Sequence, residues 1–194
     1  MQIFLETERL LLRRFTEADV NNLCDLDSDP DVMRLLTGKP TPRDVIQNET
    51  LPGILHYYER FEGYGSWAAI EKSRGDFLGW FAFRPPDGAS PDDVELGYRL
   101  RTSAWGNGYA TEGSRALIRK GFTDLGVRRV WAQTMAVNIR SQRVMEKAGL
   151  SYVRTFHEEF DDPLPGTEHG EVEYALTKAD WERREAAGRV RLSL

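Results

Sequence analysis

The chain contains a single cysteine, Cys24, and only three histidines among its 194 residues. One thiol cannot form an internal disulfide, and it does not supply a cysteine-based zinc site. The histidines, His56, His157 and His169, are spread along the sequence rather than grouped at metal-ligand spacing. We therefore expect neither a disulfide framework nor a metal centre.

Long apolar runs and an excess of positive charge are also missing. No stretch is apolar for long enough to cross a bilayer. Acids and arginines interrupt the first fifteen positions, which is unlike a secretory signal. With 26 Lys and Arg against 31 Asp and Glu, the formal net charge is −5, whereas a nucleic-acid-binding domain usually shows a basic patch. The sequence therefore predicts a cytoplasmic protein that binds neither nucleic acid nor a membrane.

The chain instead alternates between the two hydrophobic periods that are typical of helices and strands. We expect strands over residues 4–15, 66–72, 76–86, 93–100, 128–137, 152–160 and 171–177. We expect helices over residues 16–29, 41–61, 111–126, 138–149 and 178–188, the second of them kinked or split at Pro52 and Gly53. This order predicts one α/β domain over residues 1–194, with a core at about 5–181 and a polar helix and tail over 178–194.

Three glycines lie in the stretch AWGNGYATEG, residues 104–113, between an expected strand and an expected helix. Glycine is a poor helix former, but it lets backbone amides approach a ligand closely. A helix N-terminus offers a phosphate its unpaired N–H groups and the positive end of the helix dipole. The stretch is no Walker A loop, and Thr111 stands where the dinucleotide fingerprint has its third glycine. A pyrophosphate site and a plain helix-entry turn both fit it.

A second motif, VNIRSQRVMEKAGL, begins at the end of the strand expected over 128–137. Asn138 and Ser141 are three residues apart, and Val144 and Met145 follow one turn later, so these residues share one side of a helix. Asn138 also fits an N-cap, with Ser141 in the first turn and Val144 in the core. The spacing leaves both interpretations open.

Together, ELGYRL, AWGNGYATEG and VNIRSQRVMEKAGL resemble the GNAT superfamily of acetyl-CoA-dependent N-acetyltransferases, most closely the ribosomal-protein N-terminal (alanine/serine) acetyltransferase branch. The likeness extends from Leu5 to about Trp181. Trp105 replaces the first residue of the general Arg/Gln-x-x-Gly-x-Gly/Ala motif, as is usual in this branch. The resemblance implies a central, mixed, mostly antiparallel, twisted sheet of about seven strands, flanked by helices and with a splayed strand at the coenzyme A site.

The resemblance also implies acetyl-CoA as co-substrate and no metal. Amides of the glycine stretch would wrap the coenzyme A pyrophosphate, and the end of the ELGYRL strand would pair with the pantetheine arm. The start of the next helix would line the far side of that arm. The residues assigned to these contacts are Leu100, Arg101, Thr102, Trp105, Gly106, Asn107, Gly108, Tyr109, Ala110, Thr111, Asn138, Ser141, Val144 and Lys147.

Direct transfer to an amine in a ternary complex is helped by an oxyanion donor, a base and a proton donor for the departing thiolate. The resemblance places the oxyanion donor at the Leu100 backbone N–H and the base at Glu95. It places the proton donor at Ser141, with Tyr174 as a second candidate. Glu95 fits a salt-bridged or solvent-facing strand residue equally well. Competing candidates for the base are Glu158, Glu159 and Asp161.

These motifs do not specify the acceptor, which is either a protein N-terminal α-amine or a small-molecule amine. An α-amine, with a pKa of about 7.7–8, is neutral at pH 7 more often than a lysine amine at about 10.4. The acidic segment 157–173 would attract a cationic peptide, polyamine or aminoglycoside, or would only keep the protein soluble. Aromatic residues between 57 and 67 would wall the acceptor side or pack in the core. A non-catalytic acyl-CoA sensor is the alternative function, and both a monomer and a homodimer fit the sequence.

Overall fold

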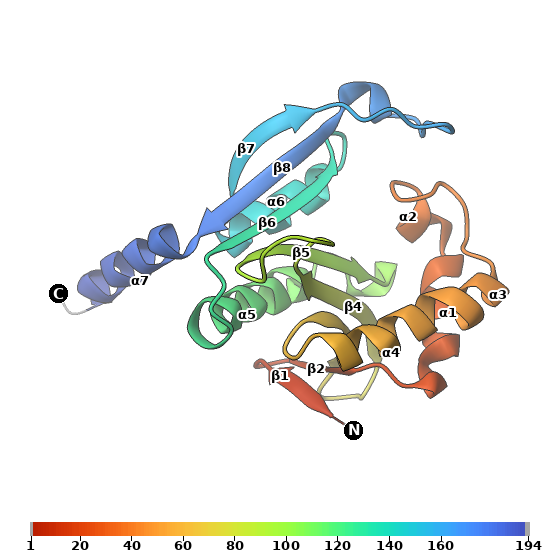
Figure 1. Ribbon diagram of the computed structural model, residues 1–194, viewed down its shortest axis with the longest axis horizontal. Coiled ribbons are helices and arrows are strands. Elements are labelled where there is room, and N and C mark those ends of the chain that lie inside the picture. Colours follow the sequence, from red (N-terminus) through yellow and green to blue (C-terminus); the bar gives the residue numbers. More distant parts are fainter. Residues whose placement is uncertain (1, 193–194) are drawn as a thin grey trace.

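The computed structural model describes residues 2–192, which contain one mixed sheet of eight strands (Figure 1). The strands are β1 (Ile3–Glu6), β2 (Leu10–Arg14), β3 (Gly65–Glu71), β4 (Phe77–Arg84), β5 (Asp93–Leu100), β6 (Arg129–Met135), β7 (Ser151–Phe156) and β8 (Glu171–Thr177). Their order is β1-β2-β3-β4-β5-β6-β8-β7, and only β5 and β6 are parallel neighbours. The predicted α/β fold with a mixed, mostly antiparallel sheet is confirmed.

The α-helices are α1 (Val20–Ser28), α2 (Pro30–Met33), α3 (Arg43–Val45), α4 (Leu51–Arg60), α5 (Tyr109–Asp124), α6 (Ile139–Ala148) and α7 (Lys178–Leu192). In Figure 1, α5 and α6 lie behind the sheet and α4 lies in front of it. Gly113 and Gly121 of α5 rest directly on the Phe81 and Phe83 rings, so that a Cβ at either glycine would overlap a ring. These glycines let α5 pack closely on β4. This close packing fixes the position of α5 beneath the end of β5.

The single strand expected over residues 4–15 is wrong, because this segment forms the antiparallel hairpin β1–β2. The Thr7 N–H donates to the Leu10 carbonyl (2.9 Å), and the Leu10 N–H donates back to Thr7 Oγ1 (2.8 Å). A threonine hydroxyl can thus close a turn that contains no glycine or proline. The sheet therefore has eight strands instead of about seven.

The break expected at Pro52 and Gly53 lies one turn earlier. Helix α4 continues through both residues, because proline is tolerated in the first turn of a helix. The irregular stretch is the π-helical turn η2 (Ile46–Thr50), which directly precedes α4. Proline clashes with the carbonyl four residues earlier, which here belongs to Asn48 within η2.

The C-terminal segment forms the polar helix α7, as predicted, and Trp181 of α7 packs on Phe122 of α5 with ring centroids 5.5 Å apart. Residues 193 and 194 of the expected tail lie outside the described residues. Between residues 2 and 192, no helix is both long and apolar enough to cross a membrane.

Candidate functional site

Strands β5 and β6 pair along only part of their length. Their parallel register joins residues 93–95 to residues 129–131. Beyond this point β5 stays beside β4 while β6 stays beside β8, so the two strands diverge (Figure 1). We call this divergence, between residues 96–100 of β5 and 132–135 of β6, the splay. Ligands of α/β sheets commonly bind beyond the carboxyl ends of diverging parallel strands.

The β5 backbone directs hydrogen-bonding groups into the splay at every second residue. The Arg101 N–H donates to the Leu78 carbonyl on the β4 side (2.8 Å), so alternation turns the Leu100 and Tyr98 amides towards the splay. In the described sheet, no β6 residue is in register with either of them. Both amides are therefore available to a ligand. The Arg101 side chain reaches Asp25 of α1 instead (3.5 Å).

The glycine loop after β5 leads directly into α5. Gly106 and Gly108 have φ of 75° and 82°, a left-handed conformation that favours glycine. A Cβ on Gly106 would meet no protein atom within 4 Å, and one on Gly108 would meet only the end of Arg9 (3.5 Å). Throughout this fully described loop, the amides of residues 106–111 donate no turn, loop or cap hydrogen bond. Gly108 also provides no side-chain cap, so the first-turn N–H groups, including those of Tyr109–Thr111, remain available to an anion.

Three predicted site residues hold this loop in shape through their side chains. Trp105 Nε1 donates to the Leu100 carbonyl (2.8 Å), and Asn107 Nδ2 donates to the Trp105 carbonyl (3.1 Å). Thr102 Oγ1 donates to Asp29 (2.9 Å), the N-cap of α2. Because these polar atoms are used within the protein, the loop amides are the groups left for a ligand.

Helix α6 also begins at the splay, but its first turn is closed by a side chain. Asn138 Oδ1 accepts from the Ser141 N–H (3.2 Å), and Asn138 Nδ2 donates to Thr134 Oγ1 (3.0 Å). The N-cap interpretation of Asn138 is therefore confirmed. Ser141 Oγ lies 2.9 Å from the Tyr98 hydroxyl, which also donates to the Ser141 carbonyl (3.0 Å). Tyr98 thus bridges β5 to α6 across the splay.

Sequence reasoning missed Tyr98. Burial raises the pKa of the Tyr98 hydroxyl to about 12, although its hydrogen bond with Ser141 acts in the opposite direction. The phenol therefore stays protonated near neutral pH. The contact joins residues 43 positions apart in the chain, so no local spacing in the sequence indicates it.

Comparison with known proteins identifies the family to which this chain belongs. The model for the family described as Acetyltransferase (GNAT) domain matches residues 9–151. The chain belongs to this GNAT family. It is an acetyl-CoA-dependent N-acetyltransferase, and GNAT acetyltransferases use acetyl-CoA as co-substrate.

The chain is 37% identical over 166 residues to the FsC-acetyl coenzyme A-N(2)-transacetylase of Aspergillus fumigatus, covering 81% of this chain and 69% of the relative. It resembles RimL, a ribosomal L7/L12 alpha-N-protein acetyltransferase solved with coenzyme A, with a TM-score of 0.74, 19% identity and coverage of 91% and 98% of the two chains. It also resembles the spermidine N-acetyltransferase of Vibrio cholerae solved with CoA and spermine, with a TM-score of 0.72, 14% identity and coverage of 90% and 99%. At these identities the solved structures show the fold alone, so the ribosomal-protein branch is one likeness among several.

In this GNAT acetyltransferase, Glu95 lies at the closed end of the splay, in register with Trp131. Burial raises the pKa of the Glu95 carboxyl, and the positive charge of Arg84 opposes this effect. Glu95 and Tyr98 are three residues apart on one strand, so their side chains point to opposite faces of the sheet. Five residues of strand place the Leu100 amide roughly 17 Å from Glu95, and three residues place the Tyr98 amide about 10 Å away. The Tyr98 amide is therefore the nearer of the two to Glu95.

Tyr174 lies on β8 and faces α6. The single proton of its hydroxyl is shared between Gln142 Oε1 (3.3 Å) and Glu146 Oε1 (3.4 Å). Burial and the Glu146 carboxylate both raise the pKa of Tyr174. Further along α6, Val144 is half-buried and Lys147 is exposed. The structure therefore brings Ser141 to Tyr98 and joins Tyr174 to a different part of α6.

Two loops meet at the open end of the splay. Glu171 pairs with Met135 at the end of β6, so the loop 157–170 between β7 and β8 starts from this end. Leu164 of this loop lies against Gly38 in the segment between α2 and α3. The acidic side chains of the loop are exposed, namely Glu158, Glu159, Asp161, Asp162 and Glu168. Of these, Glu158, Glu159 and Asp161 make no hydrogen bond that ties them to Ser141 or β5 in the described part of the chain.

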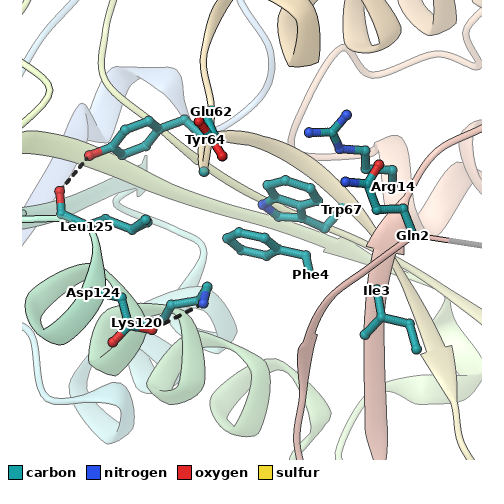
Figure 2. Close-up of a pocket in the computed structure, with 11 residues that line it drawn as sticks. Gln2, Ile3, Phe4, Arg14, Glu62, Tyr64, Trp67, Lys120, Asp124 and Leu125 are labelled. Atoms are coloured by element: carbon teal, nitrogen blue, oxygen red, sulfur yellow. Dashed lines mark hydrogen bonds and ion pairs between the residues drawn. The ribbon is translucent and has the colours of Figure 1, made fainter.

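The aromatic residues between 57 and 67 mainly pack in the core. The exposed fractions of Tyr58, Tyr64 and Trp67 are 8%, 8% and 1%, and the Phe4 ring stacks on Trp67 with centroids 3.7 Å apart. Figure 2 shows this stack among the residues that line a cavity at the C-terminal end of α5, close to Lys120. The cavity has a volume of about 500 Å³. This cavity lies at the far end of α5 from the glycine loop. Among the described residues, no group of His, Cys, Asp and Glu is arranged to hold a metal ion.

Proposed function

We propose that the protein transfers the acetyl group of acetyl-CoA to the primary amine of a cationic acceptor by direct attack in a ternary complex. The observation that carries the proposal is the meeting of two structures at one splay: the free amides of the loop that begins α5, and the Ser141–Tyr98 pair at the start of α6. The loop amides suit binding of the acetyl donor, and the Ser141–Tyr98 pair suits protonation of its leaving group.

Donor binding rests on backbone groups. The amides of residues 106–111 would bind the coenzyme A pyrophosphate, since glycines at 106 and 108 leave the approach free of side chains. The Leu100 amide would pair with the pantetheine arm as another strand would. Val144 would contact this arm from α6, while Asn138 and Thr102 would act by keeping their helices and loops in place.

The bound co-substrate supplies a thioester whose carbonyl carbon is attacked by the amine. Glu95 would accept the amine proton through water, which requires its ionised form. The Tyr98 amide would stabilise the oxyanion, and a donor of this kind contributes about 3–4 kcal/mol. Ser141 would protonate the leaving thiolate and regain a proton from water, while Tyr98 would hold the Ser141 hydroxyl in position.

The acidic loop 157–170 supports a cationic acceptor. Its exposed carboxylates border the open end of the splay, where a positive amine would be attracted. The spermidine N-acetyltransferase of similar fold was solved with spermine, a polyamine. A positively charged peptide N-terminus and an aminoglycoside satisfy the same charge requirement.

The test follows release of the coenzyme A thiol from acetyl-CoA across a panel of acceptors. The panel contains peptides with different N-terminal residues, lysine peptides with blocked N-termini, polyamines and aminoglycosides. We expect turnover with one class of cationic amine and a rate that falls as ionic strength rises. Tight acetyl-CoA binding without turnover on any member would favour the acyl-CoA sensor instead.

A further inference from the structure

The turn of the N-terminal hairpin is joined to the first turn of α5, about a hundred residues later in the chain. Glu112 of α5 accepts three hydrogen bonds from this turn and forms an ion pair with Arg9. Thr7 Oγ1 donates to Glu112 Oε1 (2.6 Å), and so does the Arg9 N–H (2.9 Å). Arg9 Nε donates to Glu112 Oε2 (2.7 Å), and Arg9 Nη2 lies 2.6 Å from the same oxygen as an ion pair. The carboxylate is therefore fully engaged by β1–β2.

Arg9 also reaches the glycine loop itself. Its Nη1 donates to the Asn107 carbonyl (2.9 Å), and its guanidinium lies over the Tyr109 ring, 4.5 Å from the centroid. One side chain thus fixes the loop at Asn107, the helix at Glu112 and the ring between them. A lysine could not form this fork, because it has a single nitrogen.

The bond to the Asn107 carbonyl sets the direction of one amide in the loop. The carbonyl of Asn107 and the N–H of Gly108 belong to the same planar, trans peptide, and they point in opposite directions. Since Arg9 holds the carbonyl on its own side, the Gly108 N–H is turned away from Arg9. Without this bond, the two glycines flanking Asn107 would let the peptide rotate.

Arg9 also balances a negative charge beside the loop. Burial raises the pKa of Glu112, but the hydrogen bonds from Thr7 and Arg9 outweigh burial and hold the pKa below its usual range. Glu112 is therefore ionised in the first turn of the helix that would receive a pyrophosphate. An ionised, unpaired carboxylate there would repel the phosphates, and the Arg9 charge removes this repulsion.

We propose that Arg9 is a positioning residue for the donor, which holds the Asn107–Gly108 peptide and Glu112 so that the glycine loop can bind the coenzyme A pyrophosphate. This inference rests on the proposed function, because it assumes that the loop binds that pyrophosphate. Arg9 acts through the loop, since its nitrogens are already bonded to Glu112 and Asn107.

The test compares two donors, acetyl-CoA and S-acetyl-pantetheine, which carries the same thioester without the pyrophosphate. Their dissociation constants are measured by calorimetry for the wild type, Arg9→Ala, Arg9→Lys and Lys72→Ala. Lys72 is the matched control, because it bonds to Glu6 and to the Thr7 carbonyl in the same hairpin but makes no bond to the glycine loop.

We expect Arg9→Ala to weaken acetyl-CoA binding about tenfold, the ratio produced by loss of one hydrogen bond to a charged group, and to leave S-acetyl-pantetheine binding unchanged. Arg9→Lys should keep the charge but lose the fork, so its affinity for acetyl-CoA should lie between those of the wild type and Arg9→Ala. Lys72→Ala should match the wild type with both donors. Equal weakening of both donors by Arg9→Ala, or no weakening of either, would overturn the inference. A wild type that binds both donors equally would instead refute the pyrophosphate site.

Discussion

Helices α5 and α6 both begin at the splay, and their first turns differ in one respect. At α6, the Asn138 side chain accepts from the Ser141 N–H and closes the turn. At α5, the N-cap is Gly108, which has a positive φ and provides no side-chain acceptor. Both helices direct a positive dipole end towards the same place. The residue at the N-cap decides which of them can bind an anion.

This difference in capping suits the two helix termini to two different tasks. The open terminus of α5 is suited to bind the donor through backbone amides. The terminus of α6 is closed by the Asn138 side chain and is suited to hold one hydroxyl, that of Ser141, against Tyr98. Affinity for the donor should therefore depend on α5, and the rate of thiolate departure should depend on α6.

Substitution of Gly108 should have the largest effect on affinity. Gly108→Val forces a branched residue into the left-handed region and places a side chain before the amides. We expect the dissociation constant of acetyl-CoA to rise about a hundredfold, from strain of about 1–3 kcal/mol and steric block together. Gly126→Val is the control, because Gly126 has a similar φ (73°) at the other end of α5 and open space around it. Equal affinity losses in the two variants, measured by calorimetry, would refute the role of Gly108.

Substitution of Ser141 should lower the rate and leave affinity intact. Ser141→Ala keeps the backbone N–H that Asn138 caps, so α6 should remain closed. We expect kcat to fall about 30-fold, less than the 10²–10⁴-fold typical of acid–base catalysis, because a thiolate leaves readily. The acetyl-CoA dissociation constant should stay within about twofold. Tyr98→Phe should lower kcat by a smaller factor, and full turnover in Ser141→Ala would exclude Ser141 as the proton donor.

The pH dependence of kcat/KM should report on the proposed base, Glu95, and not on the two helix termini. Glu95 is the proposed base and would act when ionised, so kcat/KM should fall as the pH falls through its pKa, which burial raises above the usual value. Glu95→Gln should abolish this acidic limb. Arg84→Gln removes the charge that opposes the shift, so the limb should move to higher pH. The measurement is the rate of thiol release as a function of pH. If the acidic limb stays in place in both variants, it belongs to a group other than Glu95.

The smallest effect is expected at the cap of α6. Asn138→Ala should destabilise the protein by about 1 kcal/mol, as loss of an N-cap usually does, and should change acetyl-CoA affinity by less than about twofold. Asn138→Ser should retain the cap and recover most of the stability in urea unfolding. A tenfold loss of acetyl-CoA affinity in Asn138→Ser, despite normal stability, would show that Asn138 itself binds the donor.

The sequence predicted those parts of the fold and site that depend on local pattern. The alternation of strands and helices, the Asn138 cap and the glycines before α5 are signals within a few residues of one another. The β1–β2 hairpin was missed because Thr7 closes it without a glycine or proline. The irregular turn lies ahead of Pro52 and not at it, because its position depends on backbone geometry that the residue types alone do not indicate.

The contacts that complete the site are not local. Tyr98 meets Ser141 from 43 positions away, and Arg9 meets Glu112 from 103 positions away. Both depend on the position of α5 and α6 on the sheet, which is set by packing such as that of Gly113 on Phe81. The acceptor is harder still to predict, because the loop 157–170 presents charge rather than a defined set of contacts.

The most direct test of the account is a titration of ¹⁵N-labelled protein with coenzyme A, followed through the backbone amide resonances. The account predicts large shifts for the Gly106 and Gly108 amides, because they would bind the pyrophosphate. It predicts a smaller shift for the Ser141 amide, which is already bonded to Asn138. Saturable binding that moves the Ser141 amide and leaves the two glycine amides unchanged would contradict it.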